Sequence, residues 1–158
     1  MRTIRRRRLE GKTDYKARLA LLKSEMPRLV IRKTNKYMIA QIVQTDIAQD
    51  KVICTLTSKI LLSKGWPQEM SGSLKNLSAS YLAGFLIGKL AQEKGIKKAI
   101  LDSGMNRNVK NSRIYASLKG AIDSGLEIPH DKEVLPEMEN IKTEKIAKIF
   151  DKIVGGNK

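Results

Sequence analysis

The sequence predicts an α/β fold: a small, mostly antiparallel sheet, made of a three-strand meander plus one further strand, with helices packed on it. Between residues 28 and 58, apolar and polar residues alternate in three short runs, which is the period of β-strands. Between residues 74 and 124, two longer stretches repeat apolar residues every three or four positions, which is the period of helices. A chain of 158 residues is long enough for one domain with its own core.

Residues 1–13 are predicted to form a basic arm. It carries Arg5, Arg6, Arg7 and Arg8 in succession and has a single apolar side chain between these arginines and Lys12. Such a segment has nothing to bury, so we expect it to become ordered only on a partner. Residues 14–154 are assigned to a single domain and residues 155–158 to a short tail.

A short helix is predicted from Tyr15 to Ser24. Asp14 suits its N-cap, because a carboxylate can accept from the first free backbone N–H groups. We expect Leu19 and Leu22 to face inward, and Pro27 follows its end.

Three strands are predicted next, over Arg28–Thr34, Tyr37–Gln44 and Lys51–Ser58, with turns at residues 35–36 and 45–50. The third alternates cleanly, so Val52, Cys54 and Leu56 are expected to face inward. Cys54 is the only cysteine, which excludes a disulfide framework and suggests a reducing compartment.

The strongest helical period runs from Leu74 to Lys94, after a short helix over Lys59–Lys64. Gly84 and Gly88 lie four residues apart in it, and we expect this spacing to let the helix pack closely against the sheet. A buried strand, Lys98–Asp102, follows.

The rest of the chain is predicted to add two helices. A polar, basic loop over Ser103–Asn111 leads to a helix from Ser112 to Ser124. An acidic stretch, Asp131–Glu139, precedes a last helix over Thr143–Ile153.

The charge is concentrated at one end of the chain. The whole chain carries +15, and residues 1–36 hold thirteen Lys or Arg against three acids, a surplus of ten. A nucleic-acid backbone is the polyanion that best accounts for this density. A membrane-surface helix and a merely solvated basic surface are the alternatives. The arginine run lacks an opposing apolar face, and the most apolar segment, Leu77–Ile87, is too short to span a bilayer.

Few residues suit catalysis. The chain has one histidine, His130, and one cysteine, and it has no phosphate-binding glycine motif. We therefore expect no enzyme, no cofactor and no small-molecule substrate. A metal-dependent nuclease remains as an alternative, with Asp102 at a strand end and Asp46, Asp50 and Asp123 as possible co-ligands.

Cations, amides and an aromatic ring follow one another along the first two strands, a set that can contact phosphates, sugars and base edges. Tyr37 and Tyr15 either stack on bases or pack at the sheet edge. Because aromatic residues are only 4% of the chain, we expect structured, largely double-helical RNA, recognised by its backbone and shape.

Several motifs, in order, resemble one family. They are Arg5-Arg-Arg-Arg-Leu-Glu-Gly-Lys-Thr-Asp-Tyr15, Pro27-Arg-Leu-Val30, Gly65-Trp66, Tyr81-Leu-Ala-Gly84 and Ala116-Ser-Leu-Lys-Gly-Ala-Ile-Asp-Ser-Gly-Leu-Glu-Ile-Pro-His130. The chain resembles the archaeal and eukaryotic branch of the large-subunit ribosomal protein family numbered eighteen, which binds 5S rRNA. The resemblance implies a non-catalytic, cytoplasmic, ribosome-bound protein. Its implied partners are 5S rRNA, the large-subunit rRNA and neighbouring ribosomal proteins of the central protuberance.

The expected RNA-binding residues come from three sources. The resemblance implies Arg5, Arg6, Arg7, Arg8, Lys12, Thr13, Tyr15, Arg18, Arg28, Arg32, Asn35 and Gln41. The strand pattern adds Lys33, Lys36, Tyr37 and Gln44. The loop after Asp102, more basic here than is usual in that family, adds Arg107 and Lys110. A general basic RNA-binding or RNA-chaperone protein outside the ribosome is the second hypothesis.

Overall fold

The computed structural model describes residues 3–47, 49–143 and 146–155, so most of the predicted tail lies outside the described residues. Four strands form one mixed sheet in the order β3-β2-β1-β4. Their bounds are β1 Arg28–Lys33, β2 Met38–Asp46, β3 Gln49–Thr57 and β4 Ile100–Asp102. The predicted meander is confirmed, since β2 is antiparallel to both β1 and β3. The predicted fourth strand, β4, runs parallel to β1.

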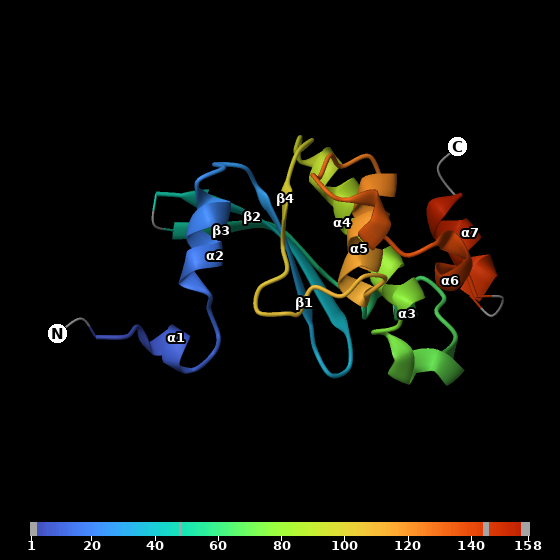
Figure 1. Cartoon of the computed structure of the whole chain (residues 1–158). Coiled ribbons are helices and arrows are strands. Elements are labelled where there is room, and N and C mark those ends of the chain that lie inside the picture. The colour runs from blue at the N-terminus through green and yellow to red at the C-terminus, as the bar shows by residue number, and fades with distance from the viewer. Residues whose placement is uncertain (1–2, 48, 144–145, 156–158) are drawn as a thin grey trace.

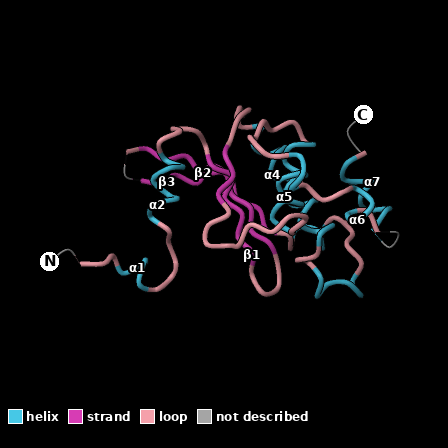
Figure 2. The backbone as a smooth tube through the Cα atoms, in the orientation of Figure 1, coloured by secondary structure: helices cyan, strands magenta, loops and turns pink. Residues whose placement is uncertain are grey.

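Helices occupy most of the remaining chain (Figures 1 and 2). The α-helices are α1 Arg6–Leu9, α2 Tyr15–Leu22, α3 Ile60–Ser63, α4 Leu77–Glu93, α5 Arg113–Asp123, α6 Met138–Ile141 and α7 Ala147–Val154, with 3-10 turns η1 Gln68–Ser73 and η2 Lys132–Val134. In Figure 1, α4 and α5 lie on one side of the sheet, and α1 and α2 lie on the other. The sheet thus has a face covered by long helices and a face turned toward the basic N-terminal segment.

The core lies between the sheet and the two long helices. Alternate residues of the strands, such as Leu29, Ile31 and Ile42, are completely buried there against α4 and α5. Cys54 belongs to the same cluster, as expected. A second cluster joins Trp66 and the start of α4 to the C-terminal helices. Burial of apolar area in these clusters is the main force that holds the fold together.

Close contact between α4 and α5 depends on three glycines. A Cβ atom on Gly84 would lie 1.9 Å from the carbonyl oxygen of Ser117, and one on Gly120 would lie 2.1 Å from that of Tyr81. Gly88 faces the Ser124 side chain in the same way. The prediction of close packing is right in kind, but the partner is helix α5 and not the sheet.

Three local expectations differ from the structure. Leu19 is 57% exposed, because α2 lies over the basic face and not on the apolar core. Val52 is 48% exposed, because the ladder shifts register between Ile42 and Val43 and so turns the start of β3 outward. The arm contains one helical turn, α1, although residues 3–12 are all exposed.

Candidate nucleic-acid interface

Asp102 stands at the centre of the basic face, at the end of β4. Its Oδ2 accepts from Arg28 Nη1 at 2.9 Å, and its Oδ1 accepts from Arg32 Nη2 at 2.8 Å. The backbone N–H of Gly104 also donates to Oδ1, at 2.9 Å. Because β4 pairs in parallel with β1, Asp102 lies opposite Val30, between the two arginines. The sheet register therefore fixes both guanidinium groups on one carboxylate.

Asp50 extends this network to α2. Its Oδ2 accepts from Arg18 Nη2 at 2.7 Å, and its Oδ1 accepts from Arg28 Nη2 at 2.8 Å. Thr45, across the β2–β3 ladder, donates its hydroxyl to the same Oδ1 at 2.8 Å. We call Arg18, Arg28 and Arg32 with Asp50 and Asp102 the arginine cluster. It carries a net charge of +1.

The three arginines differ in what they present to solvent. The side chains of Arg18 and Arg32 are 38% and 40% exposed, so both retain surface that a phosphate can reach. The side chain of Arg28 is 3% exposed and is enclosed by the two carboxylates. In this position Arg28 orders the groups around it, and the direct RNA contact expected of Arg28 stays a prediction.

The pKa of Asp50 reflects this arrangement. Burial alone would raise the pKa of the Asp50 carboxyl. Hydrogen bonds from Thr45 and the two arginines, with the charge of Arg28, outweigh that effect, so this pKa lies below its ordinary value. Asp50 therefore stays ionised at neutral pH and keeps the arginine cluster together.

The arm presents several cations beside this cluster. Arg7 Nε donates to Thr13 Oγ1 at 2.9 Å, and the Arg5 guanidinium lies 4.6 Å from the centre of the Tyr15 ring. Arg6 and Lys12 share Glu10, at 3.3 and 2.7 Å. The Asp14 carboxylate caps α2, as predicted, by accepting from the backbone N–H groups of Lys16 and Ala17. The cap fixes the start of α2 directly after the arm.

The β1–β2 turn and the sheet beside it hold the next group of expected residues. Asn35, Lys36 and Gln44 are exposed, and Gln41 Nε2 donates to Thr55 Oγ1 at 3.1 Å. The Tyr37 ring is half-buried against the second core cluster, and Lys59 Nζ lies 4.6 Å from its centre. Tyr37 and Tyr15 thus each contact a cation in the free protein.

The 103–111 loop separates its two cations. Lys110 is paired with Glu133 at 3.0 Å, whereas Arg107 lines a cavity with Lys33. Lys33 and Arg32 are neighbours in β1, so their side chains point to opposite faces of the sheet. The structure therefore places Lys33 and Arg107 apart from the arginine cluster, which the sequence pattern alone did not indicate.

Three of the four aspartates of the nuclease hypothesis have other partners, and the fourth, Asp46, is exposed at the end of β2. Asp102 and Asp50 are each occupied by two arginines, and Asp123 accepts from the Tyr81 hydroxyl at 2.7 Å. Among the described residues, no three His, Cys, Asp or Glu side chains gather in a way that suits a metal ion.

Comparison with known proteins gives consistent matches. Residues 1–97 and 88–131 match the family described as "Ribosomal large subunit proteins 60S L5, and 50S L18". A protein of Korarchaeum cryptofilum named large ribosomal subunit protein uL18 is 47% identical over 148 residues, covering 94% of this chain and 74% of that protein. The chain belongs to the uL18 family of large ribosomal subunit proteins. The uL18 proteins of Aeropyrum pernix and Methanothermobacter thermautotrophicus are 46% and 40% identical, covering 90% and 94% of this chain and 65% and 75% of their own lengths.

The region that matches the family model, residues 1–131, contains the whole arginine cluster and the arm. Helices α6 and α7 lie beyond residue 131. The chain spans about two thirds to three quarters of the length of these relatives. Within the described residues, no helix is long and apolar enough to cross a membrane.

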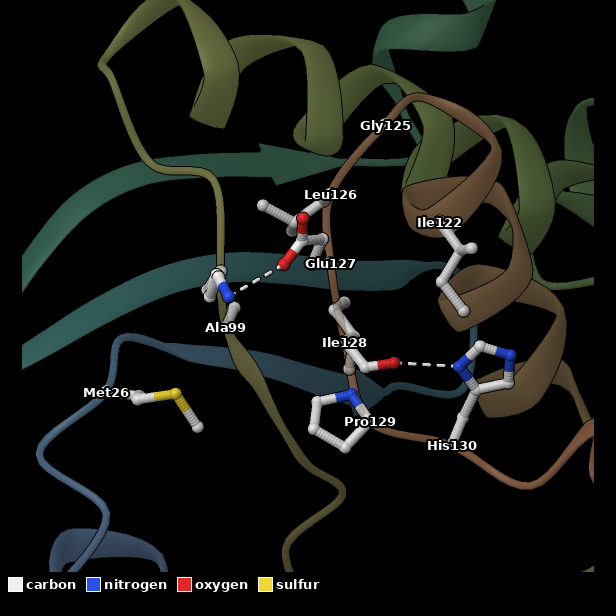
Figure 3. A pocket seen from close by; sticks show the side chains of 10 residues that line it. Met26, Ala99, Ile122, Gly125, Leu126, Glu127, Ile128, Pro129 and His130 are labelled. Atoms are coloured by element: carbon white, nitrogen blue, oxygen red, sulfur yellow. Dashed lines mark hydrogen bonds and ion pairs between the residues drawn. The ribbon is translucent and has the colours of Figure 1, made fainter.

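The sole histidine lies at an apolar depression away from this interface. His130 Nδ1 is 2.7 Å from the carbonyl oxygen of Ile128 (Figure 3). Ala99 donates its backbone N–H to the Glu127 carbonyl oxygen, which joins the two walls of the depression. Its other neighbours include Met26 and Ile122, so this surface is apolar where the arginine cluster is charged.

Two sets of residues were missed by sequence reasoning. Thr45 was expected only in a turn, and Asp50 in the same turn or as a metal co-ligand, yet together they hold Arg28 and Arg18 in place. Arg113 lines the same cavity as Arg107. The sequence indicated this only indirectly, because Arg113 directly follows Ser112, the predicted start of a helix. The register of the sheet decides which acidic residue pairs with which arginine, and the order of residues along the chain does not reveal that register.

Proposed function

We propose that this protein is a structural, non-catalytic constituent of the large ribosomal subunit that binds 5S rRNA and attaches it to the central protuberance. Membership of the uL18 family supports the ribosomal role. The observation that carries RNA binding is the basic face, on which the exposed parts of Arg18 and Arg32 lie beside an arm rich in arginine. Arginine forks match phosphate oxygens in pairs, which suits an RNA backbone.

The same face explains how the protein would recognise RNA. Few aromatic side chains are exposed there, so stacking on splayed bases is a minor contribution. The guanidinium groups of the arginine cluster are held in place, and the arm adds further exposed cations. This combination suits recognition of a folded RNA by its shape. Further contacts with the large-subunit rRNA and with neighbouring ribosomal proteins, in the cytoplasm, belong to this proposal.

An equilibrium gel-shift titration against 5S rRNA, with excess tRNA as competitor, tests the proposal. Tight binding that survives the competitor, with an affinity that falls steeply as salt rises, is the expected result. Binding that tRNA abolishes would contradict it and favour the second hypothesis, a general RNA-binding or chaperone protein outside the ribosome.

A further inference from the structure

A cavity of about 580 Å³ opens between the end of β1, the 103–111 loop and the first turns of α4 and α5. Three cations line it: Lys33, Arg107 and Arg113. We call it the basic cavity. No Asp or Glu is among the described residues that line it.

The three cations of the basic cavity lack partners within the described part of the chain: no carboxylate or hydrogen-bond acceptor pairs with their side chains. Lys110, in the same loop, differs because it is paired with Glu133 at 3.0 Å. Like charges that converge on one concave surface repel one another and raise the potential inside it. An anion in the cavity would relieve that repulsion.

Polar groups in the cavity also suit an anion. Asn76 uses its Oδ1 to accept from the Ala79 backbone N–H at 2.7 Å, which leaves its Nδ2 group to donate elsewhere. The Ser112 hydroxyl oxygen is buried and has no hydrogen-bond partner among the described residues. Asn76 and Ser112 are the N-caps of α4 and α5, so the positive ends of both helix dipoles add to the potential of the three cations.

The position of the basic cavity separates it from the arginine cluster. Lys33 lies on the side of β1 that faces α4 and α5, whereas Arg32 lies on the opposite side with Asp102. The residues that follow two of the cations in the sequence are exposed, namely Asn35 and Lys36 after Lys33 and Asn108 after Arg107.

We propose that the basic cavity binds a backbone phosphate of ribosomal RNA, as a second contact separate from the arginine cluster. This inference rests on the proposed function, since it assumes that the natural ligand is RNA. The cavity would hold the phosphate between the guanidinium groups of Arg107 and Arg113 and the ammonium group of Lys33. Two contacts on different sides of the sheet would let one protein join two RNA segments.

The test uses the full chain and the double variant Arg107→Gln/Arg113→Gln. Binding to 5S rRNA and, separately, to the large-subunit rRNA is measured over a range of salt concentrations. Each lost phosphate contact lowers the slope of log affinity against log salt by about 0.7 to 0.9. Because the cavity would hold one phosphate, for at least one RNA we expect a slope lower by about 0.7 to 0.9 and an affinity about 10-fold weaker at 0.1 M salt. Lys98→Gln, which removes a cation that is paired with Glu127 at 3.1 Å, is the control, and Arg107→Lys/Arg113→Lys should restore the slope.

The proposal would be overturned by unchanged slopes for both RNAs, by an equal loss in the Lys98→Gln control, or by wild-type protein that binds neither RNA. Binding of inorganic phosphate to the cavity is monitored by NMR. If the double variant loses phosphate binding but its salt dependence of RNA binding is unchanged, the proposal is overturned, and the cavity would bind a free anion instead. Wild-type protein that prefers tRNA to 5S rRNA would contradict the proposed function alone. A slope change on large-subunit rRNA would still support the cavity. Thermal melting of each variant confirms that the fold is retained.

Discussion

Arg28 and Asp102 form a buried ion pair across 74 positions of sequence, with Nη1 and Oδ2 2.9 Å apart. The side chains are 3% and 9% exposed, so neither charge can be compensated by water if the other is removed. The pair therefore links the basic face to the stability of the fold.

Asp102→Asn is expected to destabilise the protein by about 3–5 kcal/mol, because it leaves the Arg28 guanidinium buried and only partly paired. Chemical denaturation measures the change. Asp46→Asn, at an exposed carboxylate on β2, is the control and should change the free energy of unfolding by less than about 0.5 kcal/mol. The double variant Arg28→Met/Asp102→Asn should cost less than the sum of its single changes. Additive costs would show that the pair is not coupled.

Gly84→Ala is expected to destabilise the protein by about 1–3 kcal/mol, because the added methyl group would overlap the Ser117 carbonyl oxygen. Helix propensity alone predicts the opposite sign, a gain of about 1 kcal/mol. Gly72→Ala is the control, since a Cβ there meets nothing within 4 Å. A stabilised Gly84→Ala variant would refute the close approach of α4 and α5.

Removal of residues 1–12 should leave the fold intact and weaken RNA binding by orders of magnitude. The removed residues that the structure describes are all exposed, so they contribute no core, whereas under the proposed function they would supply several phosphate contacts. Circular dichroism checks the fold, and gel-shift titration at several salt concentrations checks the binding. Loss of helical signal well beyond α1 would contradict the assignment of an independent arm.

Stability should depend on the ionisation of Asp50. Its folded-state pKa lies below the ordinary value of 3.8, so the unfolded chain binds more protons in this range. The contribution is fully present above that ordinary value and is lost as pH falls through the lower folded-state value. Denaturation at several pH values between 3 and 7 measures it. Asp50→Asn should flatten this part of the profile; an unchanged profile would mean that other carboxylates dominate.

The fold was largely predictable from local patterns. Alternation over residues 28–57 gave the meander, and the apolar period of residues 77–93 gave α4, because burial on one face leaves a clear period in the chain. Leu19 was misjudged because period alone does not say which face of a sheet a helix covers. Its apolar side chain lies over the basic face.

The site was predictable only in its residue types. Arginines at 18, 28 and 32 were expected to bind RNA alike, yet one is buried and two are half-exposed. The difference in exposure depends on Asp50 and Asp102. Strand pairing places Asp50 beside the arginines, and the parallel pairing of β4 with β1 does the same for Asp102. Arg32 and Lys33 lie on opposite faces of the sheet because side chains alternate along a strand. The sequence-based expectation placed both in one RNA-binding set because both are cationic.

The two carboxylates of the arginine cluster have a consequence for the energetics of recognition. A free arginine side chain loses up to about 2 kcal/mol of rotamer entropy when it is immobilised. Arg18 and Arg32 are already held by Asp50 and Asp102, so most of that loss occurs during folding. The RNA would meet a preorganised template at the arginine cluster, whereas the arm, whose residues 3–12 are all exposed, would adjust its conformation during association. The same protein would thus combine a rigid surface that selects a shape with a pliable segment that strengthens the complex once the shape is matched.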